Sequence, residues 1–443
     1  MSPAFTRLAL AAALALGALP AAHAQSLQEL YDTARGYDAT YLAARALADS
    51  AQYRADQVHA LRRPNVGAAL SYGRTTNDSP VSDSTNRGPS ATLNARQSLF
   101  NRANDATISQ ADLGVDAAKA DLAIAEQDLI VRLATAYFDV LAAQDALTTA
   151  QASTKAISEQ LASAKRNFEV GTATITDTRE AQARFDLATA QELAAENDLL
   201  TKRIALDQLV GRNGVQPKPL AVPVALPPVT PADVETWVSQ AEASPPVRKA
   251  QVGYEVAQLE TSKARAGHLP TVDLSGSVGR GRTNGQSQQG LAPTVNYSGN
   301  TSQSSVGITL NVPLFAGFSV QNRVKETLLL EEQSRNNLEV ARRSATQAAR
   351  TVYFGSQSLQ ARVKALEAAE SSSQVALEAT QLGYRVGVRV NLDVLNAQTQ
   401  LFTTRRDLAR ARYDVLINNL RLRQAAGQLS PADVAAVNNL LAK

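Results

Sequence analysis

The sequence predicts an α+β membrane protein in which two tandem copies of one unit each contribute two β-strands and a long helical hairpin. Three observations indicate this class. No proline lies between Pro89 and Pro217 or between Pro313 and Pro431, and both stretches have the Ala-, Leu-, Gln-, Glu- and Arg-rich composition of long helices. Four segments alternate apolar with small or polar residues, as half-buried strands do. Matching segments also recur at offsets of 206 to 216 positions, which indicates a duplication.

Residues 1–24 are expected to be a secretory signal peptide. Arg7 precedes an apolar run over 8–19, and Ala-His-Ala at 22–24 fits the cleavage pattern. The run is too short to span a membrane. We therefore expect an exported chain beginning at Gln25, either soluble or crossing a membrane as strands.

The first copy is expected over residues 25–211. Its long helix would measure about 100 Å at 1.5 Å per residue, a length typical of coiled coils. A turn holding Gly171 separates it from a returning helix, where Asp177 and Glu180 suggest an N-terminal cap. The expected elements are an opening helix, strands at about 65–74 and 90–99, a long helix over 102–168 and a return helix over 177–210.

A proline-rich linker and equatorial segment is expected over 212–245, since residues 216–231 hold six of the seventeen prolines. The second copy is expected over 246–427, with Asn391 as a cap of its return helix, and 428–443 would form a closing equatorial segment. The expected elements of the second copy are a helix, strands at about 270–281 and 303–314, a long helix over 320–382 and a return helix over 391–426.

The strand segments favour a membrane barrel over a soluble sheet. Each is about ten residues long, which suits a tilted transmembrane strand, and aromatic residues lie at the strand-to-helix junctions (Phe100, Phe315, Phe318). The residues between paired strands, 75–89 and 281–302, are expected to be long polar loops. Four strands cannot close a barrel, and an open edge cannot exist in lipid. The chain must therefore assemble with copies of itself, in a number that the pattern leaves open.

Composition excludes several function classes. The chain has no cysteine, three histidines without metal-ligand spacing, and a formal net charge of +3. Disulfides, thiolate chemistry and a lipid-anchoring cysteine are thus excluded, and no nucleic-acid footprint is indicated. No phosphate-binding, nucleophile or metal motif occurs. We expect no enzyme, and no catalytic, cofactor or metal site.

Two segments carry a resemblance to a known family. FEVGTATITDTREAQ (168–182) and YRVGVRVNLDVLNAQ (384–398) resemble the paired periplasmic tips of the TolC family of outer-membrane channel proteins, and the tail from Leu429 to Lys443 is also similar. The resemblance covers essentially the mature chain. It implies a homotrimer in the outer membrane of a Gram-negative bacterium, with a twelve-stranded barrel above a helical coiled-coil periplasmic tunnel. Implied partners are outer-membrane lipid, a periplasmic adaptor (membrane fusion) protein and an inner-membrane pump of ABC, RND or MFS type.

The resemblance also implies roles for tip residues. Ties between neighbouring hairpins close such tunnels, and the corresponding residues here are Thr176, Asp177, Tyr384 and Arg389. Asp393 corresponds to the first of two aspartate rings in the lumen constriction, whereas Asn396 replaces the second. The adaptor-docking turns correspond to Val170, Gly171, Thr172, Val386, Gly387 and Val388. Without the resemblance, every tip residue also fits a capped helix turn with solvated charges.

The function expected from this reading is passive export. The duct would serve efflux of small toxic molecules or type I secretion of a polypeptide, and would open when pump and adaptor engage the tips. The alternative is a non-conducting scaffold or adhesin that spans the periplasm, which would show no conductance. The sequence does not distinguish the cargo or the pump.

Overall fold

The computed structural model describes residues 24–221, 223–224 and 226–442, so the expected signal peptide lies almost wholly outside the described residues. The chain divides into two compact units. One, the helical unit, comprises the described residues of Met1–Ala44, Leu122–Pro245 and Arg342–Lys443; the other, the sheet unit, comprises Arg45–Asp121 and Pro246–Ala341. None of the helices in the described ranges combines the length and apolar character that a membrane crossing needs.

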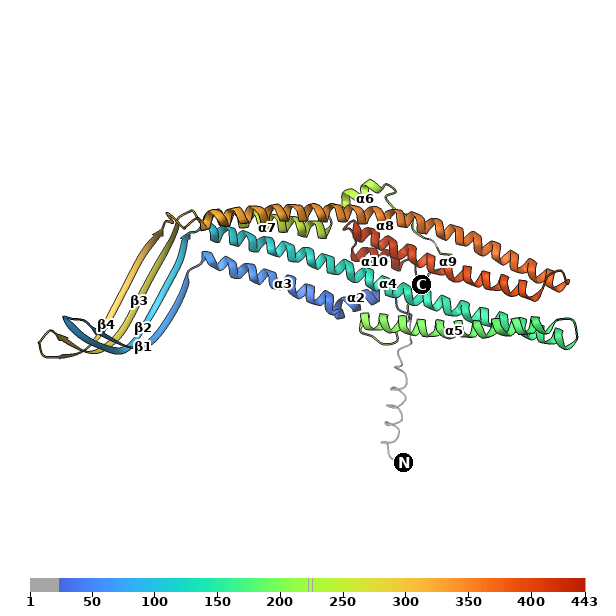
Figure 1. Ribbon diagram of the computed structural model, residues 1–443, viewed down its shortest axis with the longest axis horizontal. Helices are drawn as coiled ribbons and strands as arrows, with labels where there is room; N and C mark the ends of the chain where they lie inside the picture. The colour runs from blue at the N-terminus through green and yellow to red at the C-terminus, as the bar shows by residue number, and fades with distance from the viewer. Residues whose placement is uncertain (1–23, 222, 225, 443) are drawn as a thin grey trace, which may run out of the picture. The chain divides into compact units, whose positions relative to one another are not determined.

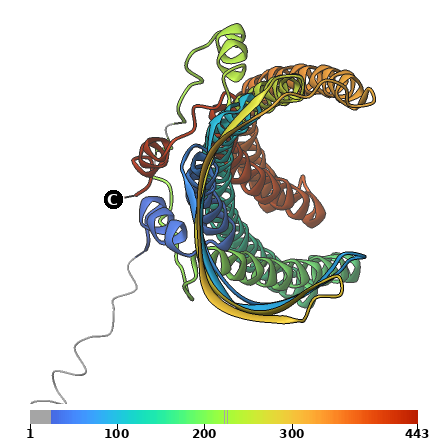
Figure 2. The same cartoon turned by 90° about the vertical axis from the view of Figure 1, so that its left-hand side faces the viewer.

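The sheet unit contains one curved four-stranded antiparallel sheet (Figures 1 and 2). Its strands follow chain order, so each pairs with its neighbours in sequence and β1 and β4 form the two edges. Residues 101 and 312–318 connect the sheet to the long helices, and Phe315 and Phe318 make an edge-to-face contact there with ring centroids 5.6 Å apart. The strands are β1 (Asn65–Asp78), β2 (Ser82–Phe100), β3 (Thr271–Gln289) and β4 (Val295–Asn311).

The prediction of long polar loops between the paired strands was wrong. Residues 75–89 continue β1 and β2 around a short turn at 79–81, and most of 281–302 continues β3 and β4. These segments are polar on both faces, so they lack the apolar alternation that marks a half-buried strand. Their Thr, Ser and Asn side chains nevertheless permit the ladder to continue. Each hairpin therefore extends well past its apolar part.

The two faces of the sheet differ in chemistry. The register places large apolar side chains on one face, here called the apolar face, where Leu70 and Val306 are each 85% exposed. The polar face carries small hydroxyl side chains that bond across strands, as between Ser71 and Ser90 at 2.8 Å. The apolar face consists of Val66, Ala68, Leu70, Tyr72, Ala91, Leu93, Ala95, Leu274, Val278, Val306, Ile308 and Leu310.

Helices below the sheet are held by polar links. In the sheet unit, Glu260 on α7 (Pro245–Ala266) accepts hydrogen bonds from Gln110 on α4 (Arg102–Glu169) at 3.0 Å and from Arg323 on α8 (Ser319–Arg385) at 2.7 Å. The bond from Gln110, with help from Arg323, lowers the pKa of this carboxyl. One carboxylate thus joins three helices.

The opening helix of the first copy is broken in two. α2 (Leu27–Tyr37) ends at Asp38, and α3 (Ala39–His59) begins directly after it. The Asp38 carboxylate accepts from the Tyr41 N–H at 2.7 Å and pairs with Arg132 at 3.0 Å. Aspartate competes for backbone donors and so favours a helix start. A local cap therefore divides a pattern that reads as one helix.

Two helical hairpins dominate the rest of the chain (Figure 1). α4, with 68 residues, turns into α5 (Ile175–Val210), and α8, with 67 residues, turns into α9 (Asn391–Ala425). At 1.5 Å per residue, α4 and α8 are each about 100 Å long. Short helices α6 (Val234–Ala241) and α10 (Pro431–Asn438) lie in the equatorial segments.

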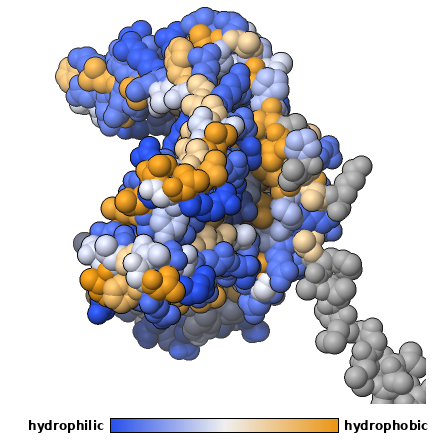
Figure 3. Space-filling model, turned by 90° about the vertical axis from the view of Figure 1, so that its right-hand side faces the viewer, coloured by the Kyte–Doolittle hydropathy of each residue, from blue (hydrophilic) through white to orange (hydrophobic). Residues whose placement is uncertain are grey.

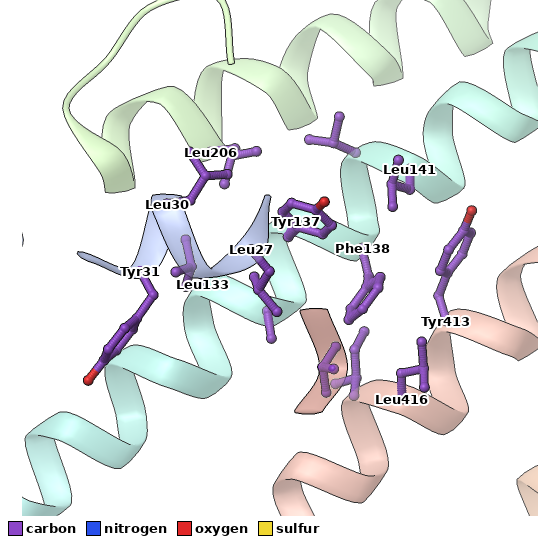
Figure 4. Close-up of a cluster of buried hydrophobic side chains, with 14 of the residues drawn as sticks. Leu27, Leu30, Tyr31, Leu133, Tyr137, Phe138, Leu141, Leu206, Tyr413 and Leu416 are labelled. Atoms are coloured by element: carbon purple, nitrogen blue, oxygen red, sulfur yellow. The ribbon is translucent and has the colours of Figure 1, made fainter. Parts of the chain in front are cut away.

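The main core of the helical unit packs α2, α4, α5 and α9 together (Figure 4). Phe138 is fully buried, and its ring stacks on that of Tyr413 with centroids 5.6 Å apart. The Tyr413 hydroxyl donates to the Asp145 carboxylate at 2.7 Å. Burial raises the pKa of both groups, so this pair is a neutral phenol holding a partly desolvated carboxylate.

Candidate functional site: the two helical tips

Both hairpin tips have the same backbone geometry. Gly171 and Gly387 adopt φ values of +76° and +80°, which glycine reaches without strain. One residue later, the Thr172 N–H donates to Asn167 O at 2.8 Å, and the Val388 N–H donates to Gly383 O at 2.9 Å. These bonds satisfy carbonyls at the helix end. The duplication thus reproduces one turn at both tips.

The caps of the return helices differ from those expected. In the first tip Thr174 is the N-cap, and its hydroxyl accepts from the Asp177 N–H at 3.2 Å while the Asp177 carboxylate accepts from the Thr174 N–H at 2.9 Å. Asp177 is therefore the reciprocal acid of a capping box, and Glu180 has no part in it. The prediction of Asp177 as the N-cap was wrong, because the N-cap lies three residues earlier. The prediction rested on the spacing of Asp177 and Glu180 and left out the threonine that precedes them.

In the second tip, Val390 is the N-cap and cannot cap with its side chain, although the Asp393 carboxylate accepts from its N–H at 3.4 Å. The expected cap, Asn391, is the first helical residue and is only 2% exposed. Its side-chain oxygen accepts a hydrogen bond from Gln160 on α4. Asn391 therefore joins two helices beneath the tip instead of capping one.

The four expected gate residues occupy both tips but do not meet within one chain. The Tyr384 hydroxyl accepts from Asn167 Nδ2 at 3.2 Å, which links the two hairpins. The Arg389 guanidinium lies 3.7 Å from the Asp393 carboxylate and remains 62% exposed. Across the described ranges, no hydrogen bond or ion pair joins Thr176 or Asp177 to either of them.

The stem of Arg389 lies over a glycine. A Cβ on Gly383 would come within 2.8 Å of Arg389 Cγ, so this position admits the arginine only while it lacks a side chain. The corresponding position in the first tip is Asn167, which uses its amide to bond Tyr384. The two copies have therefore diverged where they support the gate candidates.

The constriction candidates Asp393 and Asn396 lie on the first turns of α9. Asp393 is partly exposed and Asn396 is exposed. The Asn396 side-chain oxygen accepts a hydrogen bond from Arg184 Nη2 on α5 at 3.0 Å. The sequence reasoning missed Arg184, because no local pattern pairs residues on different hairpins. The structure thus places a cation beside the position where the family pattern has a second aspartate.

The outer surface of the tips is apolar. Val388 is 76% exposed and Val170 is 72% exposed. Ile175, Val386 and Val390 are also at least half exposed. Figure 3, which faces the end of the chain where the tips lie, shows apolar patches on an otherwise hydrophilic surface. Such patches on a soluble part of a protein mark an interaction surface.

Within the ranges that the structure describes, no group of three or more His, Asp or Glu residues is placed to hold an ion. His59 bonds Asp112 at 2.8 Å on an exposed surface.

Comparisons with known proteins agree with this architecture. The sequence model of the family described as "Outer membrane efflux protein" matches residues 30–212 and 237–428, close to the two copies. Outer membrane protein TolC of Vibrio cholerae is 32% identical over 427 residues, which cover 96% of each chain. Alkaline protease secretion protein AprF of Pseudomonas aeruginosa is 35% identical, covering 70% of this chain and 64% of the relative.

Among solved structures, the outer membrane protein VceC of Vibrio cholerae superposes with a TM-score of 0.77 and 21% identity. The match covers 90% of this chain and 96% of VceC. The four-stranded sheet and paired helical hairpins of the chain therefore belong to a fold seen in outer-membrane channel structures.

Proposed function

Because the chain belongs to the outer membrane efflux protein family, and is thus an outer-membrane exit duct that extends into the periplasm, we propose that three copies form one duct gated at its helical tips. A twelve-stranded barrel would cross the membrane and a twelve-helix tunnel would continue it. The observation that most supports this proposal is the four-stranded sheet, whose edge strands β1 and β4 have no partner among the described strands.

The sheet itself supports closure between chains. Unpaired strand edges are too costly for lipid, and single-chain barrels begin at eight strands. Pairing β1 of one copy with β4 of the next removes both edges. The apolar face then meets lipid, and the polar face, with its Ser and Thr side chains and its glycines, lines a wet lumen. Three copies give twelve strands.

We place the gate between Tyr384 and Arg389 of one copy and Thr176 and Asp177 of the next. A guanidinium and a phenol hydroxyl both donate, and a carboxylate accepts. Arg389 is largely exposed and only loosely paired at 3.7 Å within its own chain, so it remains available. Exposed pairs contribute about 0–1 kcal/mol each. Opening three such links would cost only a few kcal/mol.

The constriction would be a ring of three Asp393 carboxylates, with three Asn396 amides one turn further along α9. The tip turns at 170–172 and 386–388 would receive a periplasmic adaptor, which the exposed valines favour. An inner-membrane pump of ABC, RND or MFS type would supply the cargo. We propose small toxic molecules or a polypeptide as cargo, the latter in line with the name of AprF as a protease secretion protein. The duct itself would catalyse nothing.

Planar-bilayer recording tests the gate. Wild-type trimers should give small, cation-selective currents, and Tyr384→Phe with Arg389→Ser should raise the conductance several-fold. Arg385→Ser is the matched control, since Arg385 is an exposed neighbour on the same helix end. Unchanged conductance in the double variant would place the gate elsewhere. No current from trimeric protein in either form would favour the scaffold alternative.

A further inference from the structure

The apolar face of the sheet ends in a cluster of arginines. Arg74, Arg87, Arg280 and Arg282 share this face, because Arg74 lies opposite Arg87 and Arg280 lies opposite Ala91 in the register. Between Val66 and Tyr72 of β1 the face carries only uncharged side chains. On β1, β2 and β3 alike, an arginine follows the apolar residues of that strand toward the hairpin turn, and the four arginines are here called the arginine belt.

The charges of the arginine belt are unbalanced. The belt covers three adjacent strands, about 10 Å at a spacing of about 4.8 Å, and it runs obliquely over about 14 Å along them, from Arg280, level with Leu70, to Arg74 and Arg87. All four side chains are exposed, and none of them makes an ion pair with another described residue. The nearest carboxylates on the same face of β1 and β2, Asp78 and Asp83, lie opposite each other near the turn. Asp78 is about 14 Å beyond Arg74 along the strand.

Like charges directly opposite in a sheet destabilise it. Arg74 and Arg87 occupy such a pair, with no acidic neighbour to offset it. An arginine on the polar face is different, since Arg96, at the other end of β2, pairs with Asp273 at 2.9 Å. The sheet thus neutralises an arginine on its polar face and leaves four arginines unpaired on its apolar face. An external anion would remove the repulsion.

The orientation of the chain identifies the leaflet. The helices extend into the periplasm, so the hairpin turns point outward, and the belt comes after the apolar stretch on that side. It therefore lies at the height of the outer-leaflet headgroups, which in this membrane belong to a phosphorylated glycolipid. Guanidinium groups bind phosphate oxygens in a bidentate manner, and arginine stems extend along apolar surface to reach the interface.

We propose that the arginine belt binds the phosphate groups of the outer-leaflet glycolipid and so fixes the barrel in that leaflet. The proposal depends on the proposed function for the lipid-facing direction of the apolar face. Three copies would present twelve arginines around the barrel. Inner-leaflet phospholipid is a poor alternative, because the belt lies at the other end of the apolar stretch.

The test uses the purified full-length protein in neutral detergent with diphosphorylated lipid A in mixed micelles as the probe. Replacing all four belt arginines by glutamine should weaken binding at least tenfold. Removing both phosphates from the glycolipid should weaken wild-type binding to a similar level. A matched variant removes four exposed arginines on helices and should bind as wild type. Its substitutions are Arg45→Gln, Arg54→Gln, Arg248→Gln and Arg362→Gln.

Binding of the belt variant within twofold of wild type would overturn the proposal, as would an equal loss in the helix variant. Conductance measurements distinguish a failure of the glycolipid-binding proposal from a failure of the proposed duct function. A belt variant that conducts like wild type and no longer binds lipid A supports the belt. Wild-type trimers that bind lipid A without conducting would instead refute the proposed duct.

Discussion

Arg184 should control ion selectivity at the constriction. It donates to Asn396 at 3.0 Å, so three copies would place three guanidinium groups beside three Asn396 amides, one turn of α9 from the Asp393 ring. Replacing Arg184 by Gln removes these positive charges and keeps a donor for Asn396. We expect cation preference to rise.

The size of this effect follows from Coulomb's law. For a cation passing about 8 Å from each charge in water, one guanidinium costs about 0.5 kcal/mol, and three cost about 1.5 kcal/mol. Screening at 0.1 M salt, where the Debye length is about 10 Å, roughly halves this value. Removing the charges lowers the cation barrier by about 0.7 kcal/mol and raises the anion barrier by the same amount, so the cation-to-anion permeability ratio should rise roughly tenfold.

The assay is the reversal potential of single channels under a tenfold salt gradient. The single variant Asn396→Asp should change ion selectivity less than the double variant that combines it with Arg184→Gln. In the single variant, Arg184 would neutralise the new carboxylate. Arg179→Gln is a suitable control, since Arg179 is exposed on the same helix and, within the described ranges, makes no hydrogen bond or ion pair with Asp393 or Asn396. If the reversal potential of Arg184→Gln equals that of wild type, Asn396 and Arg184 do not face the lumen.

Two further predictions concern the helical unit. Asp38→Asn should cost about 1–3 kcal/mol at pH 7, because the Asp38 carboxylate holds Arg132 and the start of α3. Burial alone would raise the Asp38 pKa, but the bonds from Arg132 and Tyr41 outweigh it and lower the pKa, so this stabilisation is present above pH about 4 and is lost as pH falls through the folded-state pKa. Thermal melting from pH 7 to pH 3 checks this: the gap between wild type and variant should close at low pH, and a constant gap would contradict the assignment. Tyr413→Phe should cost about 1–3 kcal/mol by leaving the Asp145 carboxylate without its donor, and should also raise the pKa of Asp145 further. Denaturant unfolding checks it, and a variant as stable as wild type would show that water replaces the phenol.

The repeat and its elements were accessible from sequence because they rest on periodic patterns. α4 runs over Arg102–Glu169, where a helix over 102–168 was expected, and α5 ends at Val210 as expected. Polar strand extensions were not accessible, because Thr and Ser on both faces produce no alternation. The break at Asp38 was missed for a related reason, since a local cap interrupts an otherwise continuous helical pattern.

At the tips, the sequence indicated which residues matter but not what they contact. Tyr384, Arg389 and Asp393 come together in one tip, yet the partners Asn167 and Arg184 belong to the other hairpin. Contacts between hairpins depend on how return helices of 36 and 35 residues lie beside helices about twice as long, and no spacing within one segment encodes that. Thr174 precedes Asp177 by three residues, so the sequence also permits the Thr174–Asp177 capping box that the structure shows.

The measurement that tests the central claim most directly is cross-linking of β1 to β4 between chains. The chain has no cysteine, so Ala68→Cys on β1 can be combined with single cysteines scanned over residues 302–308 of β4. At one register, oxidation should link β1 of one copy to β4 of the next and give a covalent species of three chains that grows no further. Only monomers across the scan, or a ladder that continues beyond three, would contradict a barrel closed by three copies.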